Sequence, residues 1–162
     1  MRTNTSGCWT CWTSTACPPR RDNFYYGPNL PPAPAAYDTL SAHFAATGTG
    51  PKDYDLVLTG DLGVLGHQII VDLFAQDGVD MSQNYQDCGM LLYDIEKQDM
   101  HAGASGCGCS ASVLCGYLLR EMDEGRWKKL LFAPTGALLS PTSSFQGESI
   151  PSICHAVTIE MQ

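Results

Sequence analysis

The feature that most constrains this chain is a stretch from Ala102 to Ser112 in which every side chain is small. The stretch contains three glycines, follows an apolar segment and runs directly into a helical pattern. Because glycine permits positive φ, such a turn can aim the unpaired N–H groups of a helix N-terminus at an anion. The same residues would also suit a tight crossing of helix and sheet backbones. The residues alone leave both interpretations open.

Length and charge narrow the class of protein. The chain has 162 residues, enough for one domain, and its 44% hydrophobic and 16% charged residues are typical of a globular protein. Its formal net charge of −8 leaves no basic patch, so we predict no nucleic-acid partner. A small anion could still be held by backbone dipoles, a few local cations or a bridging metal. No apolar run reaches the roughly 18–20 residues that a membrane span requires.

The eight cysteines do not have the arrangement of a secreted disulfide scaffold. Cys107, Cys109 and Cys115 lie among small and aliphatic residues, where free cysteine acts as a compact apolar side chain. This placement favours a reducing cytosol. Cys8 and Cys11 have the spacing of a zinc knuckle, but no second Cys/His pair follows nearby. Four ligands are normally required, so we predict no metal site.

The chain divides into two regions with different patterns. Residues 1–32 show no period of 2 or 3.6, so we expect an irregular leader that could be non-native. Residues 33–162 are regular, and strands that alternate with helices predict a layered α/β domain. The final two strands have no helical pattern between them, only a loop, and could pair antiparallel. The predicted sheet is therefore mixed.

The elements of this domain follow from hydrophobic spacing. One helix is predicted from residue 33 to a stop at 48–50, a second from the turn at 60–63 to a stop at 77–78, and a third across 113–122. Strands are predicted at 55–59, 88–95, 129–133 and 153–160. The expected buried stripes are Leu65, Ile69, Leu73 and Phe74 on the second helix, and Val113, Leu114, Tyr117, Leu118 and Met122 on the third.

Several short motifs carry a family resemblance. They are Tyr54–Leu56, Thr59–Gly63, Asp87–Gly89, Tyr93–Asp99, His101–Gly116, Thr135–Leu138, Ser140–Ser143 and Gln146–Pro151. Together they resemble the C-terminal half of the stage V sporulation protein AD family, which belongs to the thiolase-like superfamily. Residues 1–21 match nothing in that family.

The resemblance implies a fold, a ligand and a location. The fold would be a thiolase-like half: a layered, mixed β-sheet with helices on both faces. The function would be to bind dipicolinic acid, or its calcium chelate, and to support its uptake into the forespore of a spore-forming bacterium. Partners would be other stage V sporulation proteins of a membrane complex, and the missing N-terminal half or a second copy. The location would be the cytoplasmic side of the sporulating cell, peripheral at the forespore inner membrane.

The resemblance also implies that the chain is not an enzyme. Thiolase-like condensing enzymes use a histidine and an asparagine from this half to stabilise an oxyanion. By alignment these positions fall on Gly60 and Ala104, neither of which has a side-chain donor. Cys107–Cys109 imitates a reactive-cysteine turn only loosely, and His155 is expected to be a hydrogen-bonded structural histidine. Two alternatives stay open: a thiolase-like acyltransferase with an unusual site, and a non-functional truncated fragment.

Dipicolinate is a flat dianion that needs donors for two carboxylates and a slot for its ring. Asp61 would repel a bare dianion, so it either meets a bridging calcium or caps the following helix; we favour the cap. Ser140 and Ser149 are weaker candidates. The candidate ligand-binding residues are Asp61, Gly63, Gly103, Ser105, Cys107, Gly108, Cys109 and Ser110.

Overall fold

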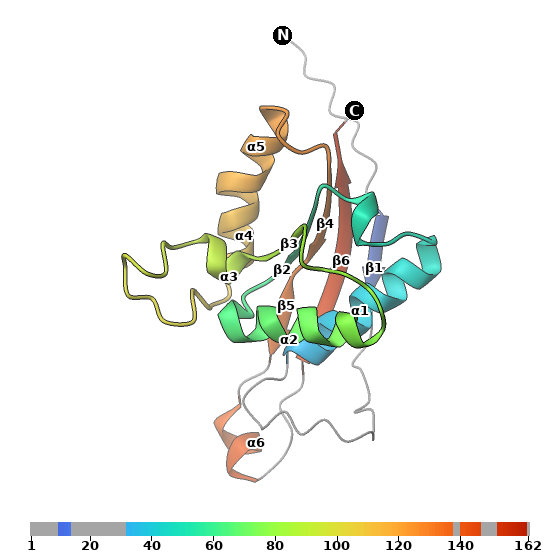
Figure 1. The fold of residues 1–162 in the computed structure, drawn as a ribbon. Helices are drawn as coiled ribbons and strands as arrows, with labels where there is room; N and C mark the ends of the chain where they lie inside the picture. Colours follow the sequence, from blue (N-terminus) through green and yellow to red (C-terminus); the bar gives the residue numbers. More distant parts are fainter. Residues whose placement is uncertain (1–9, 14–31, 138–139, 147–151, 162) are drawn as a thin grey trace.

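A computed structural model of the chain describes residues 10–13, 32–137, 140–146 and 152–161 (Figure 1). The strands are β1 (Thr10–Thr13), β2 (Leu56–Thr59), β3 (Tyr85–Asp87), β4 (Lys129–Ala133), β5 (Thr135–Ala137) and β6 (Ser152–Glu160). The main helices are α1 (Pro32–Thr47), α2 (Gly63–Gln76), α3 (Cys88–Leu91), α4 (Cys109–Val113), α5 (Leu119–Asp123) and α6 (Pro141–Phe145). A short 3-10 turn spans Pro51–Asp53, and a π-helical turn, Leu114–Leu118, joins α4 to α5.

The strands form a mixed sheet in the order β1-β6-β4-β2-β3. β2 is parallel to both β3 and β4, whereas β6 runs antiparallel to β4 and β1. β5 lies off this path and pairs antiparallel with β6. The predicted antiparallel pairing of the last long strands is thus confirmed. The parallel pair β2–β3 places the ends of both strands at one edge of the sheet, where the small-residue stretch also lies.

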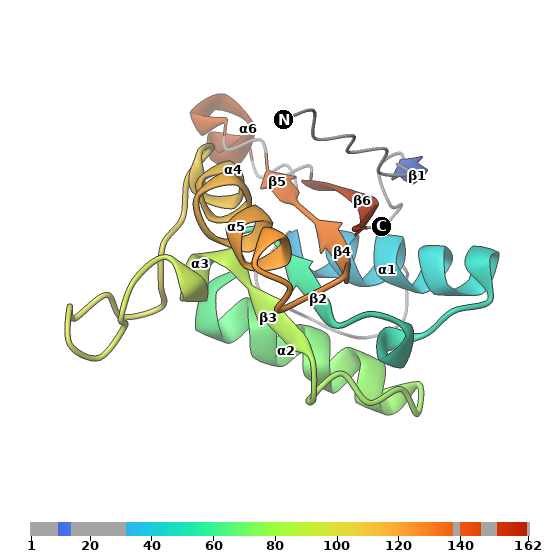
Figure 2. The same ribbon diagram turned by 90° about the horizontal axis from the view of Figure 1, so that it is seen from above.

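Two hydrophobic clusters lie on opposite faces of the sheet. All four residues of β2 are buried: Val57 belongs to the cluster with α1 and α2, and its neighbours Leu56 and Leu58 belong to the cluster with α4 and α5. Successive side chains of a strand point to opposite faces, so one short strand serves both clusters. Figure 2 shows α1 and α2 on one side of the strands and α4 and α5 on the other. The α/β class, with helices on both faces, is confirmed.

Helices α1 and α2 form as their spacing predicts. Both are followed by a glycine in the left-handed region, Gly48 with φ 65° and Gly78 with φ 76°, which is a common way for a helix to end. On α2, Ile69 and Phe74 are buried as expected, but Leu65 is 57% exposed. The predicted stripe is therefore wrong at its first position: in this turn of α2 the buried residues are Gly63 and Gly66.

The third helix is continuous from α4 to α5 but is interrupted by the π-helical turn. Val113 and Leu118 are both buried although they lie five residues apart, a spacing that a regular α-helix would place on different faces. The wide turn accommodates the extra residue and keeps both side chains on the sheet. Tyr117, expected in the stripe, is 36% exposed instead.

Three predicted boundaries are wrong. The strand expected at 88–95 is replaced by β3, which ends at Asp87, and by the short helix α3. The carboxylate of Asp87 accepts a hydrogen bond from the backbone N–H of Gly89 and so caps α3. The loop expected between the last two strands contains β5 and α6. Within the leader expected to be irregular, Thr10–Thr13 forms β1; Cys8 lies outside the described residues.

The difference between Leu58 and Leu65 gives a test of this core. Leu58 is fully buried, so Leu58→Ala should lower the free energy of unfolding by about 3 kcal/mol through lost burial and a cavity. Leu65→Ala serves as the matched control and should change it by less than about 0.5 kcal/mol. Urea unfolding followed by circular dichroism measures both. Equal effects of the two substitutions would contradict the placement of α2 and β2.

Candidate functional site

The carboxylate of Asp87 joins the ends of the two parallel strands. Its Oδ2 accepts hydrogen bonds from the Thr59 hydroxyl at 2.7 Å and from the backbone N–H of Leu62 at 3.1 Å. Its Oδ1 accepts from the backbone N–H groups of Gly63 at 2.9 Å and Gly89 at 3.0 Å. Asp87 is fully buried, and an unpaired carboxylate there would be costly. Four donors therefore fix the turn into α2 against the end of β3.

The same carboxylate orders a short chain of hydroxyl groups. Because Thr59 gives its hydrogen to Asp87, the hydroxyl of Tyr85, 2.7 Å away, must donate to Thr59 Oγ1. Burial raises the pKa of Tyr85 well above its usual value, so this hydroxyl keeps its proton. Burial also raises the pKa of Asp87, against the opposing effect of the hydrogen bonds from Thr59 and the backbone. Thr59, Tyr85 and Asp87 each have a hydrogen-bond partner here, which indicates a structural role.

The first part of the small-residue stretch, residues 102–104, is a tight crossing of backbones, and we call it the inner half. The N–H of Val64 donates to the carbonyl of Ala102 at 2.9 Å, and that of Ala104 donates to the carbonyl of Gly89 at 2.8 Å. Gly103 has φ 106°, and a Cβ atom there would lie 2.6 Å from the Gly89 carbonyl oxygen. Only glycine fits such a position without moving the backbone. For this half, the packing interpretation is confirmed.

The rest of the stretch, residues 105–112, has a different environment, and we call it the outer half. Cβ atoms built on Gly106 or Gly108 would meet no atom within 4 Å, so packing does not require glycine at either position. Gly106 has φ 145°, which favours glycine, whereas Gly108 has φ −97°, which any residue adopts. These residues line an open depression of about 420 Å³. Its opposite wall is formed by Leu92, Tyr93 and Met100. The small-residue stretch therefore has a packed inner half and an accessible outer half.

Asp61 connects the turn after β2 to the outer half. The prediction that Asp61 caps α2 is wrong: the cap position is Leu62, whose own side chain makes no capping hydrogen bond. The Asp87 carboxylate receives the first N–H groups of the helix instead. Asp61 Oδ2 accepts from the Ser105 hydroxyl at 3.0 Å and from the N–H of Gly106 at 2.8 Å. A carboxylate of the protein itself thus binds two of the donors expected for a ligand.

The structure brings together most, but not all, of the candidate ligand-binding residues. The depression is lined by Gly103, Ser105, Cys107, Gly108 and Cys109. Asp61 supports the loop from the adjoining turn, and Gly63 lies in the crossing, where a Cβ would strike the carbonyl oxygen of Ala102.

The serines are distributed differently. The Ser110 hydroxyl lies 3.1 Å from the place of a Cβ on Gly60, so it faces that turn. Ser112 lines the depression and was missed by the sequence analysis. Ser140 lies next to α6, outside the lining of the depression, and Ser149 lies outside the described residues.

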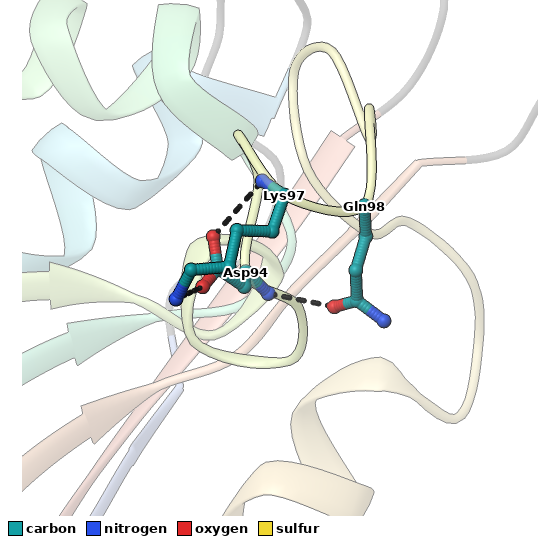
Figure 3. A network of polar contacts seen from close by, with 3 residues as sticks. All are labelled: Asp94, Lys97 and Gln98. Carbon is teal, nitrogen blue, oxygen red and sulfur yellow. Dashed lines mark hydrogen bonds and ion pairs between the residues drawn. The ribbon is translucent and has the colours of Figure 1, made fainter.

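The wall of the depression is carried by a loop at residues 92–101 that projects from the sheet (Figures 1 and 2). Figure 3 shows how its polar residues stabilise it. The Lys97 ammonium lies 2.8 Å from Asp94 Oδ2, the Lys97 N–H donates to Asp94 Oδ1 at 3.1 Å, and the Asp94 N–H donates to Gln98 Oε1 at 2.8 Å. Asp99 and His101 have positive φ of 51° and 48°. These turns hold the loop in a defined shape.

The exposure of the cysteines differs in part from the prediction that they are compact apolar residues. Cys109 is 6% exposed, as predicted for a compact apolar residue, but Cys107 and Cys115 are exposed. Burial raises the pKa of Cys154 to about 12 and that of Cys88 further still. Cys88, Cys107, Cys109, Cys115 and Cys154 are free thiols.

In the part of the chain that the structure describes, metal-binding side chains are not gathered into a site. Among the described residues, no group of three or more His, Cys, Asp or Glu side chains could hold an ion. His101 contacts Asp99 at 3.5 Å on the exposed loop. The expected hydrogen-bonded ring of His155 is not seen at Nδ1, which is buried and has no partner among the described residues. The backbone N–H of His155 donates to Pro134.

Replacing Asp87 tests whether its carboxylate holds the edge of the sheet together. Asp87→Asn puts an NH2 group against N–H or O–H donors, so we expect a loss of about 3 kcal/mol in unfolding free energy. Asp123→Asn on the exposed end of α5 is the control and should be neutral. Urea unfolding measures both variants. A neutral effect of Asp87→Asn would mean that the four hydrogen bonds contribute little.

Comparison with known proteins supports one family. The family model for stage V sporulation protein AD matches residues 21–160. Stage V sporulation protein AD of Bacillus subtilis (strain 168) is 43% identical over 128 residues, which cover 79% of this chain and 38% of the relative. The chain therefore spans about two fifths of the length of this relative. Within the described residues, no helix has the length and apolar character needed to cross a bilayer. This chain belongs to the stage V sporulation protein AD family.

Proposed function

We propose that this chain is a non-catalytic sporulation protein that binds dipicolinic acid in the depression beside the small-residue stretch. The observation that carries the proposal is the division of this stretch into a packed half and an accessible half. Close packing accounts for Gly103 and a φ of 145° accounts for Gly106, but neither accounts for Gly108, which adjoins open space. Small residues that are not needed for packing are expected where a ligand approaches the backbone.

The depression has the chemical features that dipicolinate needs. Its volume of about 420 Å³ is within the usual range for a small-molecule site. Leu92, Tyr93 and Met100 provide apolar surface for a flat ring. The N–H groups of Gly106 and Cys109 already donate to Asp61 and to the Gly106 carbonyl. Donors for carboxylates would therefore come from the other N–H groups of the outer loop and from the Ser112 hydroxyl, next to the positive end of the helix that begins at Cys109.

The charge at the site favours the calcium chelate over the bare dianion. The Asp61 carboxylate is bonded to Ser105 and Gly106, which form the rim of the depression. A free dianion would be repelled by this charge, whereas calcium carried with dipicolinate would reduce the repulsion. The described residues offer no cluster that could hold calcium independently, so the ion would arrive with its ligand.

The catalytic alternative has less support. A condensing-enzyme histidine would align with Gly60, where a Cβ would lie 2.6 Å from the backbone nitrogen of Thr135. No larger side chain fits there unless the strand shifts. The position aligned with the asparagine is Ala104, which is 8% exposed and has no side-chain donor. An oxyanion would lack both expected donors.

The wider role follows from the same proposal. We infer that the chain supports uptake of dipicolinate into the forespore together with other stage V sporulation proteins of a membrane complex. It would act peripherally at the forespore inner membrane, on the cytoplasmic side. Since the curated relative is much longer, the rest of the binding site could come from an N-terminal half or from a second copy.

Isothermal titration of the chain with dipicolinate tests the ligand site. We expect binding in the presence of calcium to be roughly tenfold tighter than without it, equivalent to about 1.4 kcal/mol. Gly108→Leu fills the depression without requiring a strained φ and should weaken binding at least tenfold. Gly116→Leu is the matched control, because Gly116 also adjoins open space but lies in the π-helical turn. Equal affinities of the two variants would place the ligand elsewhere.

An acyl-CoA hydrolysis and condensation assay tests the non-catalytic part of the proposal. We expect no turnover above a buffer blank, because the aligned positions supply no oxyanion donor. Turnover that disappears in Cys107→Ser or Cys109→Ser, but persists in Cys115→Ser, would favour the acyltransferase alternative.

A further inference from the structure

Cys107 and Cys109 flank a single glycine at the point where the loop enters the third helix. Gly108 has φ −97° and ψ −8°, within the helical region. Helical geometry separates the Cα atoms on either side of a residue by about 5.5 Å. Disulfides join Cα atoms that are about 4.4–6.8 Å apart. The Cα separation thus falls within the range of a disulfide, but residues two apart in helical geometry turn their side chains to opposite sides. The backbone at Gly108 must therefore rotate before the two sulfurs can meet.

Access to the two thiols is unequal. Cys107 is exposed, whereas Cys109 is 6% exposed, and both line the depression. Gly106 and Gly108 have open space where a side chain would be, so no neighbour blocks a rotation of the loop. Such a rotation has to break the hydrogen bond from the Cys109 N–H to the Gly106 carbonyl. The depression therefore gives a small reagent access to Cys107, with Cys109 behind it.

We propose that Cys107 and Cys109 form a reversible intraloop disulfide when the protein meets a low-molecular-weight disulfide. The Cys107 thiolate attacks one sulfur of the reagent, forms a mixed disulfide and releases one thiol. The Cys109 thiolate then attacks the Cys107 sulfur and expels the second thiol. The protein loses two hydrogens, which protonate the two leaving thiolates, and the reagent is reduced to two thiols.

The surroundings of the two residues determine the order of these steps. Burial raises the pKa of Cys109, and the charges of Asp61 and Asp87 raise it further. Cys109 is thus a poor first nucleophile, but it can attack once a sulfur is held next to it. Its attack is the slower step and should become faster as the pH rises.

Formation of the disulfide should loosen the site. Cys109 packs in the cluster that contains Leu58 and Phe132, so its sulfur must leave this cluster to meet Cys107. Cys107 directly follows Gly106, whose N–H donates to Asp61, and movement there strains that hydrogen bond. A disulfide with these costs is readily reduced again.

The test uses the complete chain with Cys115→Ser, which removes the other exposed cysteine of this segment. In this background the tryptic peptide 98–120 contains only Cys107 and Cys109. The reduced protein is treated with oxidised glutathione, alkylated, digested and analysed by mass spectrometry. We expect peptide 98–120 to lose two hydrogens and to become resistant to alkylation, and dithiothreitol should restore both thiols.

Two further variants separate the steps. Adding Cys109→Ser should trap a stable glutathione adduct on Cys107, and adding Cys107→Ser should abolish the reaction at this peptide. The proposal is overturned if the adduct on Cys107 is equally stable with Cys109 present, or if neither thiol reacts. It is also overturned if peptide 98–120 becomes linked to peptide 53–97, because that would pair one of the two cysteines with Cys88.

Discussion

The buried carboxylate of Asp87 is the interaction on which this edge of the molecule depends. One charged group accepts hydrogen bonds from the end of β2, the first turn of α2 and the first turn of α3. Because it replaces water for four donors at once, the chain can make two sharp turns side by side in the interior. The crossing of Gly63, Gly89 and Gly103 is built directly on those turns. The accessible outer loop in turn extends from this crossing, so the position of the depression depends on a residue that does not line it.

Much of the fold could be predicted because it depends on local spacing. The helices α1 and α2 have apolar periodicity and a terminal glycine, and β2, β4 and β6 show buried runs or alternation. Where these signals are absent, prediction failed: β5 and α6 lie in a stretch rich in Ser, Thr and Pro that has no period. The boundary of β3 was misplaced for another reason, since the apolar run after Asp87 suggested a strand. Asp87 caps α3 through Gly89, and its side chain is held in place for this by partners up to 28 residues away.

The candidate site was predictable in composition but not in geometry. The small-residue stretch was identified from its sequence, and Gly103, Ser105, Cys107, Gly108 and Cys109 lie together in the structure. Which of these glycines packs and which adjoins open space depends on distant backbone, namely the carbonyl of Gly89. The partner of Asp61 could not be predicted either, because Ser105 and Gly106 lie more than forty residues away. Leu92 and Tyr93 look like core residues in the sequence, and only the projecting loop places them on the wall.

The π-helical turn at Leu114–Leu118 has a consequence for how sequence changes would be tolerated in the third helix. The wide turn changes which face of α5 follows the buried face of α4, since Val113 and Leu118 are both buried although they lie five residues apart. Removing one residue within this turn could convert it to a regular α-helical turn and leave both apolar faces aligned. The same deletion within α4 or α5 would rotate one end by about 100° and bring polar groups onto the sheet. Length variation in this segment is therefore tolerable at one place, halfway along the helix, where the side chains of Cys115 and Tyr117 are exposed to water.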